Sequence, residues 1–189
     1  METRWDQLPD DFRKCAEFHG HVCPGLAIGY RASLAAMEFL EQKRALDEEL
    51  VAIVENDACG VDAVQVLTGC TFGKGNLIHK DYGKQVFTFI GRESGKGVRV
   101  ALRAGVIDLP KGEKPTLRER EEKMKRILSL PRTQLFAIKE MILPPPPKAV
   151  IEPSIPCDRC GEPTMKSKLK QIEGERLCME CVISQGLVS

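Results

Sequence analysis

Two pairs of cysteines near the C-terminal end carry the clearest chemical signal in this sequence. Cys157 and Cys160 form one CxxC motif, Cys178 and Cys181 form a second, and seventeen residues separate the two motifs. Zinc prefers four tetrahedral ligands, and each CxxC turn can place two thiolates on one ion. We therefore predict a structural zinc site, closed by four protein ligands and so unsuited to catalysis. Two disulfides or an iron–sulfur cluster are the alternatives.

The residues around these cysteines predict a small zinc module. A hairpin is expected within residues 162–177, turning near residues 173–175, and a short helix is expected from Met179. This order of knuckle, hairpin and helix is typical of a treble-clef or ribbon zinc finger. Because the module has almost no core, metal binding would supply most of its folding free energy. Its basic residues are offset by acidic ones, which favours an ordinary solvated surface over a nucleic-acid interface.

A second group of metal-binding residue types lies near the start of the chain. His19, His21 and Cys23 occupy alternate positions, which face one side of an extended segment. Pro24 favours an extended Cys23 and a helix start just after it, so this thiol would lie at the positive end of a helix. Imidazole nitrogen and thiolate sulfur are suitable zinc ligands. The alternative is that His21 and Cys23 merely cap or pack the helix.

Two further segments contain residues that could complete such a site. Cys59 follows a predicted buried strand and could give a His/His/Cys metal site, while Asp62 and Gln65 share one face of the next helix. That face could orient a ligand or hold a substrate. Further on, Cys70 and Lys74 lie in a glycine-rich segment whose backbone could approach a ligand closely, with Lys74 contacting an anion. The alternative for this segment is an ordinary turn, and its spacing does not match a Walker phosphate-binding loop.

These residues must be positioned by a mixture of helices and strands. Apolar periodicity, prolines and glycines predict helices and strands in turn along the chain. Helices are expected at 9–18, 24–44, 61–67, 116–129 and 131–141, and strands at 50–54, 76–80, 85–91 and 97–103. The last two strands should form a hairpin across residues 93–96, and Cys15 should lie in the core. The fold class is therefore predicted to be α+β, with helices packed on a mixed or antiparallel sheet.

Four consecutive prolines at residues 144–147 indicate a stiff spacer, because they cannot form a helix. We therefore predict a core domain at 1–147 and the zinc finger at 148–189. The 189 residues suffice for one domain with a core and a small appendage.

Charge and hydropathy limit the classes of partner. The formal net charge is +1, which gives no electrostatic reason to expect nucleic-acid or membrane binding. The first residues lack the apolar stretch of a signal peptide, and no apolar run is long enough to span a bilayer. We therefore expect a cytoplasmic protein, in which the eight cysteines are more often metal ligands or catalytic groups than disulfides.

Three separated motifs resemble the FmdE family, which takes its name from formylmethanofuran dehydrogenase. They are FHGHVCPGLAIGYRA at 18–32, ENDACGVDAVQVLTGCTFGKGNL at 55–77 and DYGKQVFTF at 81–89. The resemblance implies an α+β core with a metal-binding active site, in some members an added C-terminal treble-clef finger, and a homodimer. It also implies an association with the molybdenum or tungsten enzyme that makes formylmethanofuran.

The resemblance also assigns residues to the site. The preferred ligands of a second metal, expected to be zinc, are His19, His21 and Cys59, with Cys23 as a substitute ligand or nearby thiol. The catalytic candidates are Cys23, Asp62, Cys70 and Lys74, with Lys74 stabilising negative charge.

Three functions are compatible with these features. The first is a metal-dependent enzyme or enzyme subunit whose three protein ligands leave one coordination position open. The second is a non-catalytic metal or cofactor chaperone, or an assembly protein for a molybdenum or tungsten enzyme. The third, which the balanced charge disfavours, is a zinc-finger regulator that binds nucleic acid.

Overall fold

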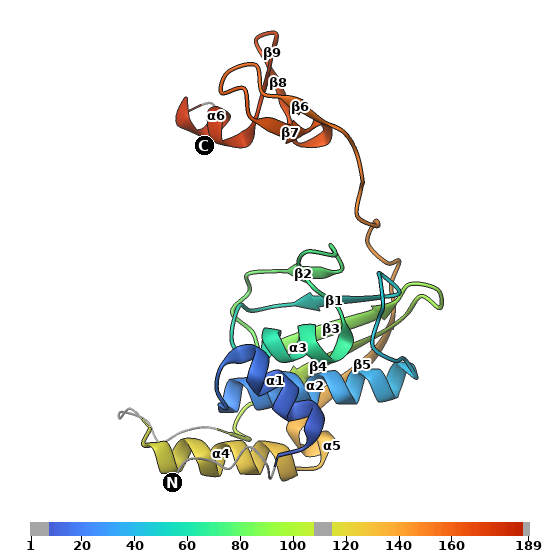
Figure 1. The fold of residues 1–189 in the computed structure, drawn as a ribbon. Helices are drawn as coiled ribbons and strands as arrows, with labels where there is room; N and C mark the ends of the chain where they lie inside the picture. Colours follow the sequence, from blue (N-terminus) through green and yellow to red (C-terminus); the bar gives the residue numbers. More distant parts are fainter. Residues whose placement is uncertain (1–7, 108–114, 187–189) are drawn as a thin grey trace. The chain divides into compact units, whose positions relative to one another are not determined.

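The computed structural model describes residues 8–107 and 115–186. Contacts within the chain divide it into two units, Met1–Ala149 and Val150–Ser189 (Figure 1). The division follows directly after the proline spacer. The first unit is the α+β domain, and the second contains the four C-terminal cysteines.

A five-stranded sheet forms the centre of the first unit, in the order β2-β1-β3-β4-β5. The pair β1–β2 is parallel and the other three pairs of this sheet are antiparallel, so the sheet is mixed, which is one of the two arrangements predicted. The predicted hairpin is confirmed by the antiparallel β3–β4 pair. The strands are β1 (Leu50–Val54), β2 (Leu77–His79), β3 (Val86–Gly91), β4 (Lys96–Leu102) and β5 (Phe136–Ile142).

The fifth strand corrects the prediction of a helix over residues 131–141. Pro131 does start a helix, but α5 (Arg132–Leu135) lasts only one turn before β5 begins. Phe136 and Ile138 face the core while Ala137 and Lys139 are exposed, which is the two-residue period of a strand. Pairing with the free edge of β4 satisfies the backbone and outweighs the local helix signal.

Helices cover one face of the sheet (Figure 1). They are α1 (Asp10–His19), α2 (Pro24–Leu40), α3 (Gly60–Thr68) and α4 (Leu117–Ser129). The central helix α2 contacts α1, α3, α4 and the strands β3 and β4. It ends four residues earlier than the predicted residue 44, because Glu41 takes a left-handed conformation with φ of 52°. Cys15 is fully buried, which confirms its predicted place in the core.

One apolar core joins the helices to the inner face of the sheet. Its largest fully buried side chains include Phe12 of α1, Leu26 of α2, and Phe87 and Phe89 of β3. This packing holds three helix ends close together, namely the C-terminal end of α1 and the N-terminal ends of α2 and α3. Across residues 8–107 and 115–186, no helix combines the length and apolar character needed to cross a membrane.

The second unit is built from short elements around the cysteines. The first hairpin pairs β6 (Ser154–Pro156) with β7 (Pro163–Met165), and the second pairs β8 (Lys170–Ile172) with β9 (Glu175–Leu177). The 3₁₀ turn η2 (Lys166–Lys168) lies between the hairpins, and the helix α6 (Met179–Ser184) follows the second one. The predicted turn near 173–175 is confirmed, with Glu173 and Gly174 at φ of 49° and 89°. The predicted helix from Met179 is confirmed as α6.

Candidate metal centres

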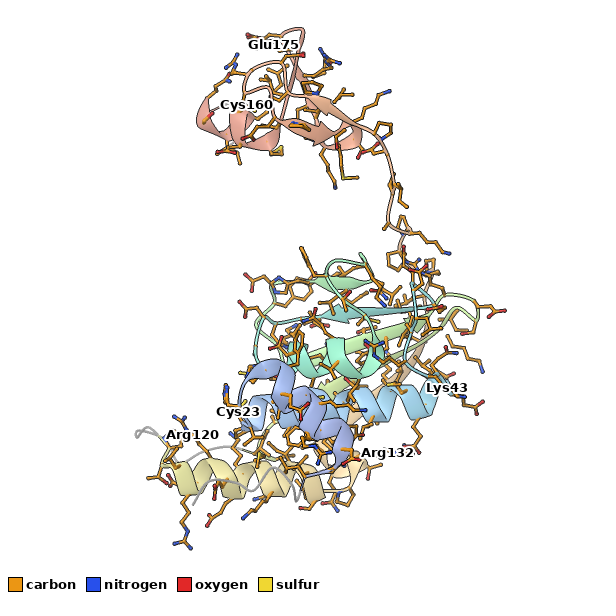
Figure 2. All side chains as sticks on the ribbon, in the orientation of Figure 1. Cys23, Lys43, Arg120, Arg132, Cys160 and Glu175 are labelled. Atoms are coloured by element: carbon orange, nitrogen blue, oxygen red, sulfur yellow. The ribbon has the colours of Figure 1, made fainter. Side chains whose placement is uncertain are left out.

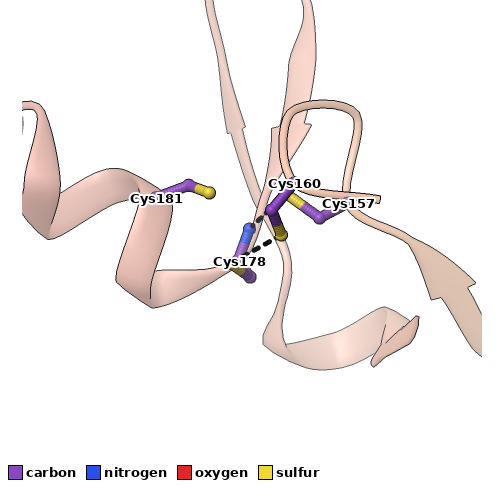
Figure 3. Close-up of side chains that lie close together, drawn as sticks. All are labelled: Cys157, Cys160, Cys178 and Cys181. Atoms are coloured by element: carbon purple, nitrogen blue, oxygen red, sulfur yellow. Dashed lines mark hydrogen bonds between the residues drawn. The ribbon is translucent and has the colours of Figure 1, made fainter. Parts of the chain in front are cut away.

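The four C-terminal cysteines form a compact cluster (Figure 3). One sulfur from each of Cys157, Cys160, Cys178 and Cys181 lies within 4.8 Å of every other. The Cys160 and Cys178 sulfurs are 3.8 Å apart. Tetrahedral zinc with Zn–S bonds of about 2.3 Å places its sulfurs about 3.8 Å from each other. The donor set and its dimensions therefore fit one zinc ion.

Backbone amides lower the pKa of one thiol in this cluster. Hydrogen bonds from the amides of Cys160, Cys178 and Arg159 lower the pKa of the Cys157 thiol to about 6. The tight turn closes with a hydrogen bond from the Gly161 amide to the Cys157 carbonyl, at a φ of 76° that favours glycine. The lowered pKa favours the thiolate form of Cys157, which is the form that binds zinc.

Ion pairs hold the first cysteine turn against the second hairpin. Arg176 Nη2 lies 2.7 Å from Asp158 Oδ1, and Arg159 Nη2 lies 2.6 Å from Glu175 Oε2. In these pairs, two arginines of the finger bind carboxylates of the same unit. They therefore connect the first cysteine turn to β9 and neutralise two arginines of the finger.

The N-terminal histidines and Cys23 form a second cluster. Ligand atoms of His19, His21 and Cys23 lie within 4.8 Å of one another. Cys23 Sγ is 3.9 Å from His19 Nε2, and the two imidazole rings lie 4.4 Å apart between centroids. A nitrogen and a sulfur on one tetrahedral zinc ion would be about 3.6 Å apart. Only a small adjustment of side chains would bring these three donors onto one ion.

Asp62 determines which nitrogen of His19 faces this cluster. Its Oδ2 atom lies 2.6 Å from His19 Nδ1, and the carboxylate can only accept, so Nδ1 carries the proton. The Nε2 lone pair is then directed to the side of Cys23. A metal-binding histidine commonly donates the N–H of its other ring nitrogen to a carboxylate, which fixes the orientation of the imidazole. Asp62 thus fixes the orientation of His19, a candidate ligand, and this contact is compatible with one of the two roles predicted for its helix face.

The local sequence explains why these side chains converge. His19 is the last residue of α1, which ends because Gly20 adopts a left-handed φ of 90°. The chain then turns into α2, where Cys23 is the N-cap and its sulfur accepts the Leu26 amide at 3.3 Å. Figure 2 labels Cys23 at this position, on the domain that contains α1 to α3.

Cys59 lies beside Cys23 but outside the group of mutually close ligand atoms. A Cβ atom placed on Gly25 would be 3.7 Å from the Cys59 sulfur and 3.9 Å from the Cys23 sulfur. Burial raises the pKa of the Cys23 thiol, the Leu26 amide opposes this shift, and the neighbouring Cys59 thiol adds to it. The structure therefore brings Cys23 to the two histidines, in the position for which the sequence preferred Cys59.

A cavity of about 420 Å³ opens next to His19. It is bordered by α3, by the segment that precedes α3, and by β2. Its polar lining comprises His19, Asn56, Asp57, Cys59, Asp62 and His79, and Phe72 is its exposed aromatic residue. Sequence reasoning did not identify Phe72 or His79. The parallel pairing of β2 with β1, which sets His79 opposite Val54 on the helix side of the sheet, is what brings His79 here.

Cys70 and Lys74 are not brought to this cavity. Cys70 is fully buried and donates to the Leu50 carbonyl, with sulfur and oxygen 3.3 Å apart. Lys74 Nζ lies 3.2 Å from the Asp47 carbonyl oxygen, and Asn76 is buried with its amide on the carbonyls of Asp47 and Leu50. These contacts hold the segment after α3 against the start of β1. The catalytic role predicted for Cys70 and Lys74 has no geometric support from this arrangement.

Comparison with known families gives two matches. Residues 18–137 match the family described as "FmdE, Molybdenum formylmethanofuran dehydrogenase operon". Residues 151–182 match the prokaryotic dksA/traR C4-type zinc finger. The second match and the four-cysteine cluster together indicate a structural zinc site in the C-terminal unit.

Two individual proteins are similar to most of this chain. A crystal structure of a tungsten formylmethanofuran dehydrogenase FmdE-like protein from Syntrophus aciditrophicus superimposes with a TM-score of 0.66. It is 27% identical, and the match covers 89% of this chain and 88% of that one. A probable S-adenosyl-L-methionine-binding protein of Archaeoglobus fulgidus is 33% identical over 205 residues, covering 93% of this chain. The match spans only 55% of that relative's length.

Proposed function

The chain belongs to the FmdE family, and from this premise we propose that its first domain is a metal-dependent enzyme or part of a larger enzyme. His19, His21 and Cys23 would hold a divalent ion, zinc being the best fit to two nitrogens and one sulfur. The contact of 2.6 Å between His19 Nδ1 and Asp62 is the observation that carries this proposal. A carboxylate in that position fixes the imidazole with Nε2 free for a metal.

The cavity beside His19 supports a catalytic use of the ion. Three protein ligands leave a fourth position open, and the ion would supply Lewis-acid chemistry to a molecule bound there. Asp62 keeps His19 oriented through the reaction. Phe72 and His79 form exposed walls that would contact a substrate, while Asp57 adds negative charge. The substrate would be a small molecule of a size that a cavity of about 420 Å³ admits.

For the C-terminal unit we propose a treble-clef fold around a structural zinc ion. The order of a cysteine turn, hairpins and a helix carrying Cys181 supports this assignment. Because all four positions of the ion would be filled by sulfur, the finger would take no direct part in the reaction.

The biological setting is also a proposal. The family description and the name of the Syntrophus protein both refer to formylmethanofuran dehydrogenase, which supports an association with a molybdenum or tungsten enzyme. We also propose that the protein works as a cytoplasmic homodimer. The Archaeoglobus relative is described as binding S-adenosyl-L-methionine. Nearly half of that relative lies outside the matched region, so this ligand is one to test on the present chain.

A non-catalytic metal or cofactor chaperone is the second candidate function. His21 is exposed, so one ligand of the cluster is accessible at the surface. An accessible ligand suits the transfer of an ion to a partner protein. Binding of nucleic acid by the finger is the least supported function, because carboxylates pair with two of its arginines.

Metal analysis of the full chain, purified without chelators, tests the proposal. We expect two metal ions per chain by plasma mass spectrometry. His19→Ala and Cys23→Ser should each lose one ion, and Cys160→Ser should lose the other. One ion per wild-type chain, or two ions in folded His19→Ala, would overturn the proposed site. Transfer of the core ion to a competing protein within seconds would favour the chaperone over the enzyme.

A further inference from the structure

The starts of helices α2 and α3 are in direct backbone contact. A Cβ atom placed on Gly29 would lie only 2.0 Å from the Gly60 carbonyl oxygen. A Cβ atom on Gly60 would lie 3.1 Å from the Gly25 carbonyl oxygen. No side chain separates the two helices at these points, so the residues that precede them are also brought close together.

Cys23 and Cys59 are those preceding residues. Cys23 is the N-cap of α2, and Cys59 is the N-cap of α3. Both sulfurs border the small space that Gly25 leaves free of a side chain, within 4 Å of the position its Cβ would take. Both cysteines are partly exposed and neither is in a disulfide. Partly exposed thiols are within reach of a dissolved oxidant.

The metal cluster contains only one member of this pair. The Cys23 sulfur is grouped with His19 and His21, whereas Cys59 is outside this group and lines the neighbouring cavity. We propose that Cys23 and Cys59 form a reversible disulfide that removes the Cys23 sulfur from the metal cluster. The pair would make metal retention in the core depend on the redox state of the protein. This inference rests on the proposed function, because it requires an ion at His19, His21 and Cys23.

The oxidant we propose is a hydroperoxide. The Cys59 thiol, which lies outside the metal cluster, attacks one peroxide oxygen as its thiolate, the O–O bond breaks, and the departing oxygen takes up the Cys59 thiol proton, giving a sulfenic acid on Cys59 and one alcohol or water. The Cys23 thiolate then leaves the metal cluster and attacks the Cys59 sulfur, the S–O bond breaks, and the departing hydroxide takes a proton from solvent to become water. The two cysteine sulfurs lose two electrons and the peroxide gains them. A dithiol reductant reverses the change by thiol–disulfide exchange.

The experiment compares the reduced, metal-loaded full chain with its Cys59→Ser variant during treatment with hydrogen peroxide. Metal release is followed with a colorimetric chelator, and disulfides are mapped by mass spectrometry of peptides. We expect the wild type to release one equivalent more than Cys59→Ser and to yield a peptide that joins Cys23 to Cys59. Dithiothreitol should allow the ion to rebind. In Cys59→Ser the core ion should stay bound, in Cys23→Ser dimedone should trap a sulfenic acid on Cys59, and Cys59→Ala repeats the test should the serine variant misfold.

Two outcomes would overturn the inference without touching the proposed function. In the first, oxidised wild type retains its core ion while both thiols stay free. In the second, reduced Cys59→Ser already lacks the core ion, which would make Cys59 a ligand. By contrast, a reduced wild type that holds only the finger's ion contradicts the proposed function itself, whether or not the two cysteines form a disulfide.

Discussion

His19 Nδ1 and Asp62 Oδ2 lie 2.6 Å apart, although 43 positions separate the two residues in the chain. The contact joins the last residue of α1 to the first turn of α3. His19 keeps 13% of its side chain exposed and Asp62 keeps 33%, so both reach the surface of the cavity. The two residues thereby connect the packing of the helices with the candidate metal site formed by His19, His21 and Cys23.

Replacing Asp62 should weaken metal binding without unfolding the domain. In Asp62→Ala the imidazole of His19 loses the acceptor that fixes its orientation, and we expect about 10- to 100-fold lower affinity for the core ion. Competition with a chromophoric chelator measures this change. Asp57→Ala is the matched control, because Asp57 lines the same cavity and its side chain makes no hydrogen bond or ion pair within residues 8–107 and 115–186. Equal affinities of the two variants would contradict the assigned role.

The contact between α2 and α3 predicts that Gly29 cannot be replaced. In Gly29→Ala the new Cβ would stand 2.0 Å from the Gly60 carbonyl oxygen, so the helices must separate. We expect the free energy of unfolding to fall by about 3 kcal/mol or more. Gly73→Ala is the control, since a Cβ there meets nothing within 4 Å. Urea unfolding of both variants measures the difference, and equal midpoints would refute the close approach.

Zinc should stabilise the C-terminal finger independently of the core. Cys160→Ser removes one of four sulfurs, and the finger should unfold because metal binding supplies most of its folding free energy. NMR should show the loss of dispersed signals from residues 150–186 only, with one zinc ion fewer per chain. Ser167→Ala, in the same unit but outside the cluster, should keep its zinc. A finger that remains folded without metal would disprove this account.

The residues before the finger are predicted to be anchored by a buried ion pair. Arg92 donates to the carbonyls of Pro146 and Pro147 and lies 3.0 Å from Glu48, whose carboxylate also accepts the Ala149 amide. Arg92 and Glu48 are only 10% and 11% exposed. Glu48→Ala leaves the buried Arg92 guanidinium without its carboxylate partner, so we expect the free energy of unfolding to fall by about 3 kcal/mol and proteolysis near residue 149 to become faster. Glu93→Ala is the control: Glu93 is exposed and lines the same surface cavity as Glu48 and Arg92, and its replacement should change neither quantity.

Buried thiols should make the first domain sensitive to alkali. Burial raises the pKa of Cys15 to about 12 and that of Cys70 to about 11, from an ordinary value of 9.0. Because the folded pKa exceeds the unfolded one, this contribution to stability is complete below pH 9 and is lost as the pH rises through 11 to 12. Urea unfolding at pH 8 and pH 10.5 measures the decline. At pH 8, thiol reagents should modify Cys15 and Cys70 only on unfolding, and rapid modification of the native protein would contradict their burial.

The sequence predicts those features whose signals lie close together along the chain. Cysteine spacing predicted the finger cluster, because a CxxC turn fixes two sulfurs within a few residues. Gly20 and Pro24 mark the end of α1 and the start of α2, so the His19–Cys23 cluster was also readable from local rules. The local rules failed at residues 136–141, where pairing with a distant strand determined the conformation.

The long-range contacts of the site depend on tertiary structure. Asp62 reaches His19, and Cys59 reaches Cys23, only because the glycines of α2 and α3 let the two helices touch. His79 lines the cavity because of the register of the parallel β1–β2 pair. Cys70 is buried in the core because the segment after α3 packs there. Sequence spacing therefore determined which side chains could bind a metal. Helix packing and strand register decided which of them meet, because these contacts join residues whose separation along the chain carries no local signal.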